Sequence, residues 1–302
     1  MISRLKSPYL LLVFVAILWA GNIVVSKKII YSLPPFTLSM IRFLLASVLL
    51  LPWLLRKKSF TKLRESKAFY RLLFMAVTGV LLFNSFLYSG LRFTSAINAS
   101  FVNSLSPLAI FILSVFWLKE EITYRQILGL IVSFLGVLWI VSQGNYLNII
   151  NMQLNIGDIF VFAGCFTWAL YSNMAKVVMR KIPPMETAAL GIVIGTVFLI
   201  PASIFELQFY KDIEISWVTA VTIAYLVVFA SIVATALWFD GINKVGAARA
   251  ANYYNLIPIF SIIMAVIFLK EELFTYHYIG GILVFSGLYL SSAVPPKKKF
   301  TN

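Results

Sequence analysis

The chain has 302 residues, of which 61% are hydrophobic and only 12% are charged, and its mean hydropathy is +0.93. A soluble protein of this length needs far more polar surface, so the composition excludes that class and predicts an integral membrane protein. The formal net charge of +14 therefore does not indicate nucleic acid. Basic residues of membrane proteins gather in cytoplasmic loops, where membrane lipids are the expected partners.

Runs of about 20 apolar residues predict membrane-spanning helices. Continuous apolarity over this length favours helices over the strands of a barrel. The expected fold class is therefore an all-α membrane protein with ten transmembrane helices. In chain order, the predicted spans lie near residues 8–26, 35–55, 70–90, 96–117, 124–142, 157–178, 184–204, 217–239, 247–268 and 275–293.

The sequence contains an internal duplication. The stretch Pro107–Glu121, PLAIFILSVFWLKEE, returns 151 residues later as Pro258–Glu272, PIFSIIMAVIFLKEE. Earlier in the chain the offset is 149, as Trp19 and Trp168 show. A repeat of this length predicts that one supersecondary unit has been built twice.

The duplication divides the predicted spans into two five-helix repeats. The first covers residues 1–142 and the second residues 157–294, with a linker loop at 143–156 and a basic cytoplasmic tail at 295–302. Because each repeat has an odd number of spans, the second copy is expected to enter the membrane upside down. Inverted repeats of this kind give transporters two related states around a central site.

The distribution of basic residues predicts the orientation. Of the 25 Lys and Arg residues, 19 fall on the side of the two termini and five on the opposite side, with Arg42 inside the second span. Both termini are therefore expected in the cytoplasm, with the protein in the plasma membrane.

Several of these features together resemble a known family. Trp19 lies in a Trp-Ala-Gly-Asn turn, a Pro-Pro pair precedes the second span, Arg42 lies in Leu-Ser-Met-Ile-Arg-Phe-Leu-Leu-Ala, and the Pro107–Glu121 stretch is duplicated. In this order they look like the EamA-type permeases of the drug/metabolite transporter superfamily, over nearly the whole chain. The resemblance implies a ten-helix carrier of small metabolites, often an exporter of amino acids or related compounds.

Two prolines lie inside predicted spans. Pro107 and Pro258 each remove a helical hydrogen bond, which frees the carbonyls of Asn103 and Tyr254. A freed carbonyl is tolerated in lipid only beside protein or a wet cavity, so we expect helix kinks that line a cavity. The alternative is a kink that only eases helix packing.

Polar and aromatic residues at matching positions of the two repeats predict a substrate-binding pocket. Aromatic walls with a few amides and hydroxyls suit small, partly apolar solutes. The alternative is that such residues join helices or mark the membrane interface. The candidate residues are Trp19, Asn22, Asn84, Tyr88, Asn103, Trp168, Tyr171, Thr235, Trp238, Tyr254 and Asn255.

Arg42 is a further candidate, because an ionisable residue within a span is functional by default. Its matching position in the second repeat is Gly191, so it could bind a carboxylate or a phosphate asymmetrically. The alternative is that it reaches outward to the interface or pairs with backbone carbonyls.

The remaining ionisable residues argue against several functions. All eleven acidic residues fall in loops or at span ends, which argues against a proton-coupled antiporter with a mid-membrane carboxylate. The sole histidine, His277, belongs to no cluster with metal-ligand spacing. We therefore expect no catalytic residue, metal site or cofactor, and no enzymatic activity.

The sequence thus predicts a secondary transporter of small organic metabolites, an exporter of amino acids or related compounds, that works by alternating access at a midplane cavity. Efflux of organic cations, drugs or nucleosides is the alternative within transport. A channel or a membrane-embedded enzyme is the alternative outside it. Substrate identity, coupling ion, direction, favoured conformation and the choice between monomer and homodimer stay open.

Overall fold

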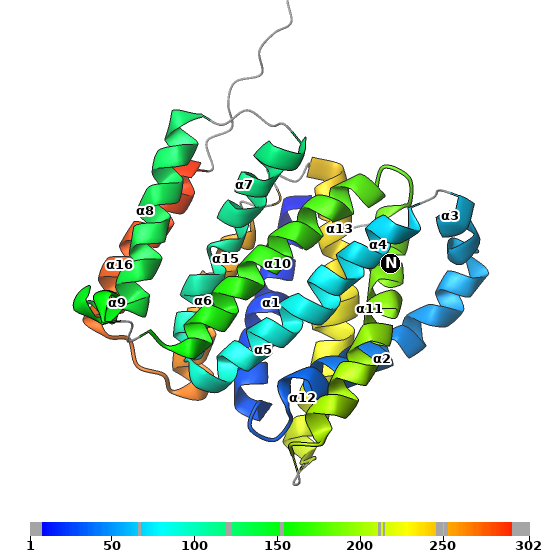
Figure 1. Ribbon diagram of the computed structural model, residues 1–302, viewed down its shortest axis with the longest axis horizontal. Coiled ribbons are helices and arrows are strands. Elements are labelled where there is room, and N and C mark those ends of the chain that lie inside the picture. The colour runs from blue at the N-terminus through cyan, green and yellow to red at the C-terminus, as the bar shows by residue number, and fades with distance from the viewer. Residues whose placement is uncertain are drawn as a thin grey trace, which may run out of the picture.

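A computed structural model describes residues 8–65, 68–118, 123–151, 154–210, 213, 215–245, 250 and 253–291. Every regular element within these residues is a helix (Figure 1). This confirms the all-α class. The part of the chain so described contains seven helical stretches long and apolar enough to cross a membrane: Pro8–Ile29, Pro35–Arg56, Phe69–Phe93, Ala96–Leu113, Tyr124–Val141, Pro184–Leu207 and Trp217–Val245.

Proline pairs determine where two of the helices begin. Pro35 is the first residue of α2 (Pro35–Arg56) and Pro184 is the first residue of α11 (Pro184–Leu207). At this position the missing N–H costs nothing, and the fixed φ of proline already suits a helix. The other uninterrupted helices are α1 (Pro8–Ile29), α3 (Ser59–Glu65), α8 (Tyr124–Val141), α9 (Leu147–Ile150), α10 (Ile156–Val178) and α16 (Thr275–Ser291).

Two long stretches contain π-helical segments at matching positions of the duplication. In the first half, η2 (Val77–Leu82) joins α4 (Phe69–Ala76) to α5 (Phe83–Phe93). In the second half, η3 (Leu226–Val233) joins α12 (Trp217–Tyr225) to α13 (Ala234–Val245). Wide π turns shift the backbone hydrogen-bond ladder, which leaves carbonyls available to side chains. A third such segment, η4 (Ala265–Leu269), follows α15 (Leu256–Met264).

The two prolines of the duplicated stretch begin new helices. The turn at Ser104 and Leu105 separates α6 (Ala96–Asn103) from α7 (Ser106–Leu118), and Pro107 is the second residue of α7. Pro258 is likewise the third residue of α15, after a turn at Asn255. The predicted kinks inside continuous helices are therefore breaks, because a proline is accommodated most easily in the first turn of a helix.

Some predicted features lie outside the described residues. These are residues 119–122, which include Glu120 and Glu121, most of the stretch 246–252 where the ninth predicted span begins, and the basic tail at 295–302.

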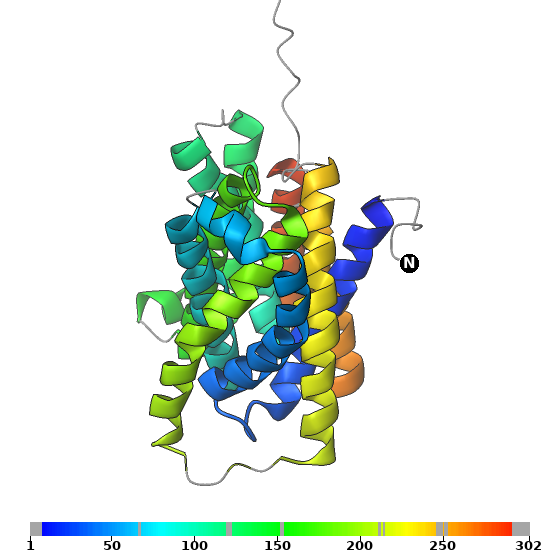
Figure 2. The same ribbon diagram turned by 90° about the vertical axis from the view of Figure 1, so that its right-hand side faces the viewer.

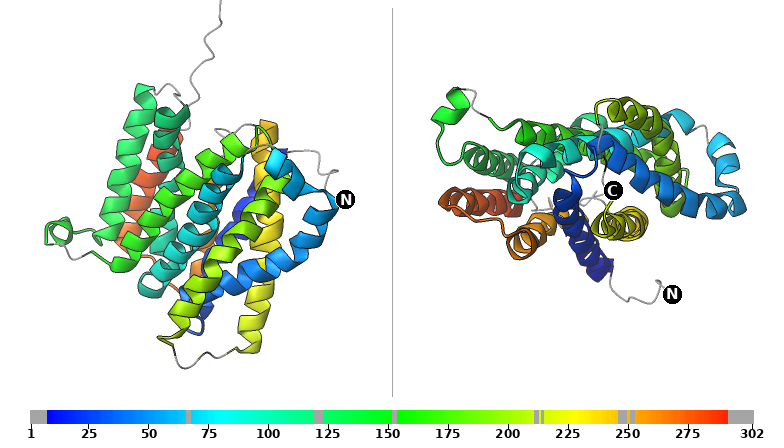
Figure 3. Two further views of the ribbon diagram at one scale, coloured as in Figure 1. Left: turned by 45° about the vertical axis from the view of Figure 1, so that its right-hand side comes forward. Right: turned by 90° about the horizontal axis from the view of Figure 1, so that it is seen from below.

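The helices run along one general direction (Figures 1 and 2). Helices α8 and α16 lie side by side at one edge, and α2 and α3 lie at the opposite edge. Seen from below, α1 lies between α15 and the α12–α13 stretch (Figure 3). Helix α10, which corresponds to α1 in the sequence duplication, contacts both α5 and α7.

The contact between α8 and α16 is a seam of small residues, defined by Gly129, Ser133, Gly136, Gly280 and Gly287. A Cβ atom added to Gly136 would lie 2.7 Å from the carbonyl oxygen of Gly280, and one added to Gly287 would lie 2.5 Å from that of Gly129. Residue numbers rise along one helix as they fall along the other, so the pair is antiparallel. The glycine stripes therefore pack against each other within one chain.

Candidate functional site

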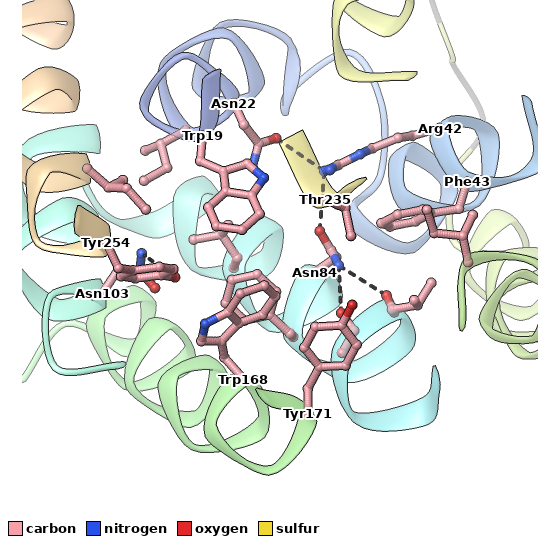
Figure 4. Close-up of a pocket in the computed structure, with 17 residues that line it drawn as sticks. Trp19, Asn22, Arg42, Phe43, Asn84, Asn103, Trp168, Tyr171, Thr235 and Tyr254 are labelled. Atoms are coloured by element: carbon pink, nitrogen blue, oxygen red, sulfur yellow. Dashed lines mark hydrogen bonds between the residues drawn. The ribbon is translucent and has the colours of Figure 1, made fainter. Parts of the chain in front are cut away.

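A buried pocket lies at the centre of the bundle, where helices of both halves meet. Nine of the predicted site residues line it (Figure 4): Trp19, Asn22, Arg42, Asn84, Asn103, Trp168, Tyr171, Thr235 and Tyr254. Its cavity volume is about 50 Å³, a fraction of the roughly 300–1,000 Å³ of typical ligand pockets. The residues that the duplication pointed to are thus brought together, around a space that holds only a few water molecules.

Arg42 is the centre of a hydrogen-bond network on one side of the pocket. Its side chain is 4% exposed, and its Nε donates to Ser231 Oγ at 2.5 Å. Its Nη1 donates to Asn22 Oδ1 and Asn84 Oδ1, both at 3.2 Å, and to the hydroxyl of Tyr88. Arg42 therefore points into the bundle and bonds to side chains, neither reaching outward nor pairing with backbone carbonyls.

The π-helical segments hold the partners of Arg42 in place. Asn84 Nδ2 donates to the Gly79 carbonyl of η2 at 2.9 Å, and Ser231 Oγ donates to the Leu226 carbonyl of η3 at 2.8 Å. Trp19 Nε1 also donates to a carbonyl of η3, that of Ala230, at 3.2 Å. Because these donors are occupied by the backbone, the side-chain oxygens of Asn84 and Ser231 face the guanidinium.

Aromatic rings form the opposite wall. The ring centroids of Trp19 and Trp168 are 5.5 Å apart, with an edge-to-face arrangement. The ring of Tyr254 lies 5.8 Å from Trp19 and 5.9 Å from Trp168, and that of Tyr171 lies 5.0 Å from Trp168. These separations are those of aromatic pairs in contact, so the wall is packed.

Five predicted residues do not line the pocket. Tyr88 lies behind it and donates to Asn22 Oδ1 at 2.9 Å, and the Trp238 ring packs 5.3 Å from Trp19. The buried Oδ1 of Asn255 has no hydrogen-bond partner within the described chain. Pro107 and Pro258 stand at the helix breaks beside the pocket and do not line it themselves.

Other lining residues carry no signal in the sequence. Apolar side chains at this pocket follow the same pattern as those of the core, so only the folded chain distinguishes them. They are Ile23, Phe43, Val80, Phe83, Leu87, Ile192 and Ile257, together with Gly79.

The acidic residues at helix ends hold the turn between α5 and α6. The Glu271 carboxylate accepts hydrogen bonds from the backbone N–H groups of Ala96 at 2.8 Å and Ile97 at 2.9 Å. Asp158 Oδ1 accepts one from Thr94 Oγ1 at 2.6 Å. Both α5 and α6 contribute pocket residues, so these contacts help to position the site.

The fold is that of an integral membrane protein with a buried pocket at its centre. The EamA-like transporter family matches residues 6–142 and 155–293 of the chain, so the chain belongs to that family. Because the family consists of transporters, the protein is a transporter and no enzyme.

Individual relatives agree with this assignment. An uncharacterized transporter of Archaeoglobus fulgidus is 31% identical, over 95% of this chain and 98% of its own length. The uncharacterized transporter YyaM of Bacillus subtilis is 27% identical, over 95% of this chain and 93% of its own length. A probable amino-acid metabolite efflux pump of Escherichia coli is 24% identical, over 93% of each chain.

A solved crystal structure shares the fold. The two chains superpose with a TM-score of 0.67 at 18% sequence identity, over 95% of this chain and 98% of the other.

Proposed function

We propose that the protein is a secondary transporter that exports small organic metabolites, amino acids or related compounds, across the plasma membrane. The observation that carries the proposal is the central pocket, in which residues from both halves face one another around Arg42 and the Trp19–Trp168 pair. The E. coli relative, named as a probable amino-acid metabolite efflux pump, supports this substrate range.

Alternating access between two inverted five-helix repeats is the proposed mechanism. The family matches the chain twice, once in each half, which supports the repeat. The α8–α16 seam supports the inversion, since Gly136 meets Gly280 and Gly129 meets Gly287 in an antiparallel pair. In the duplication, Gly129 corresponds to Gly280 and Gly136 to Gly287. Exchanging the two halves therefore converts the Gly136–Gly280 contact into the Gly129–Gly287 contact. The topology proposed with this mechanism is ten spans with both termini in the cytoplasm.

The size of the cavity supports a conformational cycle. A space of about 50 Å³ does not admit an amino acid, so the conformation described is closed around the site. Substrate entry then requires helices of the two halves to separate, and the substrate shifts the population toward states that contain it.

Flux in proteoliposomes tests the proposal. Uptake and efflux of labelled amino acids, organic cations and nucleosides are measured with and without a pH gradient. We expect saturable flux of amino acids or related compounds, lost in Trp168→Ala and retained in Phe166→Ala. The latter removes a ring of the same helix that is 52% exposed, away from the pocket.

Other outcomes contradict the proposal in different ways. Flux that does not saturate indicates a channel. Saturable flux of organic cations or nucleosides alone means that the protein transports a different substrate class from the one proposed. Equal flux in Trp168→Ala and Phe166→Ala means that the pocket is not the transport site.

A further inference from the structure

We infer that the pocket binds solutes with a net charge of −1, carboxylates on an aromatic or apolar body, in preference to zwitterions and cations. The inference rests on the proposed transport function and narrows its substrate class.

The pocket holds a positive charge that no carboxylate among its lining residues compensates. A guanidinium is ionised at every physiological pH, and Arg42 is 4% exposed. Its hydrogen-bond partners are the amides of Asn22 and Asn84 and the hydroxyl groups of Tyr88 and Ser231, and none of them is a carboxylate. The residues that line the pocket include no aspartate or glutamate. A buried charge without a counterion is costly, so a bound anion stabilises this site more than a neutral solute does.

Two hydrogen-bond donors at the pocket have no partner among the described residues. No hydrogen bond to a described residue uses Arg42 Nη2, since those recorded start from Nε and Nη1. Trp168 Nε1 is buried and also lacks a partner among the residues that the structure describes. The nearest amide oxygens are already engaged, because Asn22 Oδ1 accepts from both Arg42 and Tyr88. A carboxylate can accept hydrogen bonds from these two donors, whereas an ammonium group only donates and cannot use them.

An α-amino acid is disfavoured by its own geometry. Its ammonium and carboxylate groups are attached to the same carbon, so anchoring the carboxylate on Arg42 brings a second positive charge close to the guanidinium. Like charges at this range repel strongly in a buried site. A carboxylate without the amine avoids this repulsion.

The rest of the pocket suits a flat or apolar body. Figure 4 shows Arg42 on one side and the rings of Trp19, Trp168 and Tyr254 across from it. A carboxylate held by Arg42 thus extends its remaining atoms toward aromatic faces and edges, which favour another ring.

Three probes with one phenylethyl body and different charges test the inference: 3-phenylpropionate, phenylalanine and 2-phenylethylamine. Binding to the purified protein in detergent at neutral pH is measured by the quenching of tryptophan fluorescence, and flux by proteoliposome uptake against empty vesicles. We expect phenylpropionate to bind at least tenfold more tightly than phenylalanine, with the amine weakest.

Substitutions locate the preference. Arg42→Gln is expected to bring the three affinities within about twofold of one another. The control is Arg92→Gln, because Arg92 bonds to Tyr210 outside the pocket. This control is expected to leave the order of the three affinities unchanged. Should Arg42→Gln fail to fold, Trp168→Phe removes only the Nε1 donor and part of the ring. That variant is expected to weaken phenylpropionate about threefold more than the amine.

The two proposals fail in different ways. Phenylalanine that binds as tightly as phenylpropionate, together with saturable amino-acid flux, overturns the inference and leaves the transport function standing. A preference for the anion that is as large in Arg42→Gln as in the wild type also overturns it, as does an unchanged preference in Trp168→Phe where that variant takes its place. Absence of saturable flux for every solute, with anion binding intact, overturns the transport function instead.

Discussion

The central pocket and the α8–α16 seam use buried space in opposite ways. At the seam, Gly136 and Gly280 bring two backbones so close that no Cβ fits between them. At the pocket, large side chains from both halves surround a cavity, and a charged group is held there by Asn84, Ser231 and their neighbours. Close backbone packing stabilises the seam, whereas the buried polar groups of the pocket cost stability.

The difference predicts how each region responds to substitution. Variants of the seam act on the free energy of unfolding, because backbone atoms cannot move aside to admit a side chain. Variants of the pocket act on transport, because its polar side chains bond chiefly to one another and to the π-helical segments.

The largest effect on stability is expected from Gly136→Ala. Its new Cβ would lie 2.7 Å from both the Gly280 oxygen and the Val284 nitrogen, and overpacking of this kind costs about 2 kcal/mol. The measurement is thermal unfolding of the purified protein in detergent. Gly191→Ala is the matched control, since its Cβ meets only the flexible end of Met75. Equal melting temperatures for the two variants would contradict the close packing of the seam.

Asn84→Ala is expected to reduce transport about tenfold. It removes an acceptor of Arg42 and leaves the Gly79 carbonyl unbonded, and the loss of a hydrogen bond to a charged group costs roughly 1.5–3 kcal/mol. Initial rates of proteoliposome flux check this, and gel filtration confirms that the variant is folded. Wild-type rates would show that the network around Arg42 does not shape the site.

Tyr88→Phe isolates one hydroxyl behind the pocket. The ring stays in place, whereas the hydrogen bonds to Arg42 and Asn22 are lost. We expect this loss to cost about 1 kcal/mol of free energy. We expect a loss of transport of about fivefold with little change in the melting temperature. A drop in melting temperature as large as that of Gly136→Ala would erase the distinction between the two regions.

Pro107→Ala tests the helix break beside the pocket and has the smallest expected effect. Alanine restores an N–H that can bond to the Asn103 carbonyl and join α6 to α7, so we expect transport to fall about threefold while membrane insertion is unchanged. Pro201→Ala, at an exposed position inside α11, is the control. Faster transport in Pro107→Ala would mean that the break hinders the cycle.

The sequence by itself determined the environment, the helical class and the duplication. Lipid satisfies no backbone hydrogen bonds, so long apolar runs must be helices, and hydropathy alone reveals them. The repeat of Pro107–Glu121 and the matched positions of Trp19 and Trp168 then indicated which polar and aromatic residues face the centre. Eight residues predicted in this way line one pocket, together with Arg42, which its charge within a span had indicated.

Only the tertiary structure decided how those residues meet. The direction of the Arg42 side chain depends on Ser231, which lies 189 positions away in the chain, in a π-helical segment. No local sequence pattern predicts this contact or the π-helical segment. The apolar lining, such as Phe83 and Ile192, looks like ordinary core in the sequence. Periodicity reports which face of a helix is covered, whereas the identity of the covering residues depends on the packing of distant helices.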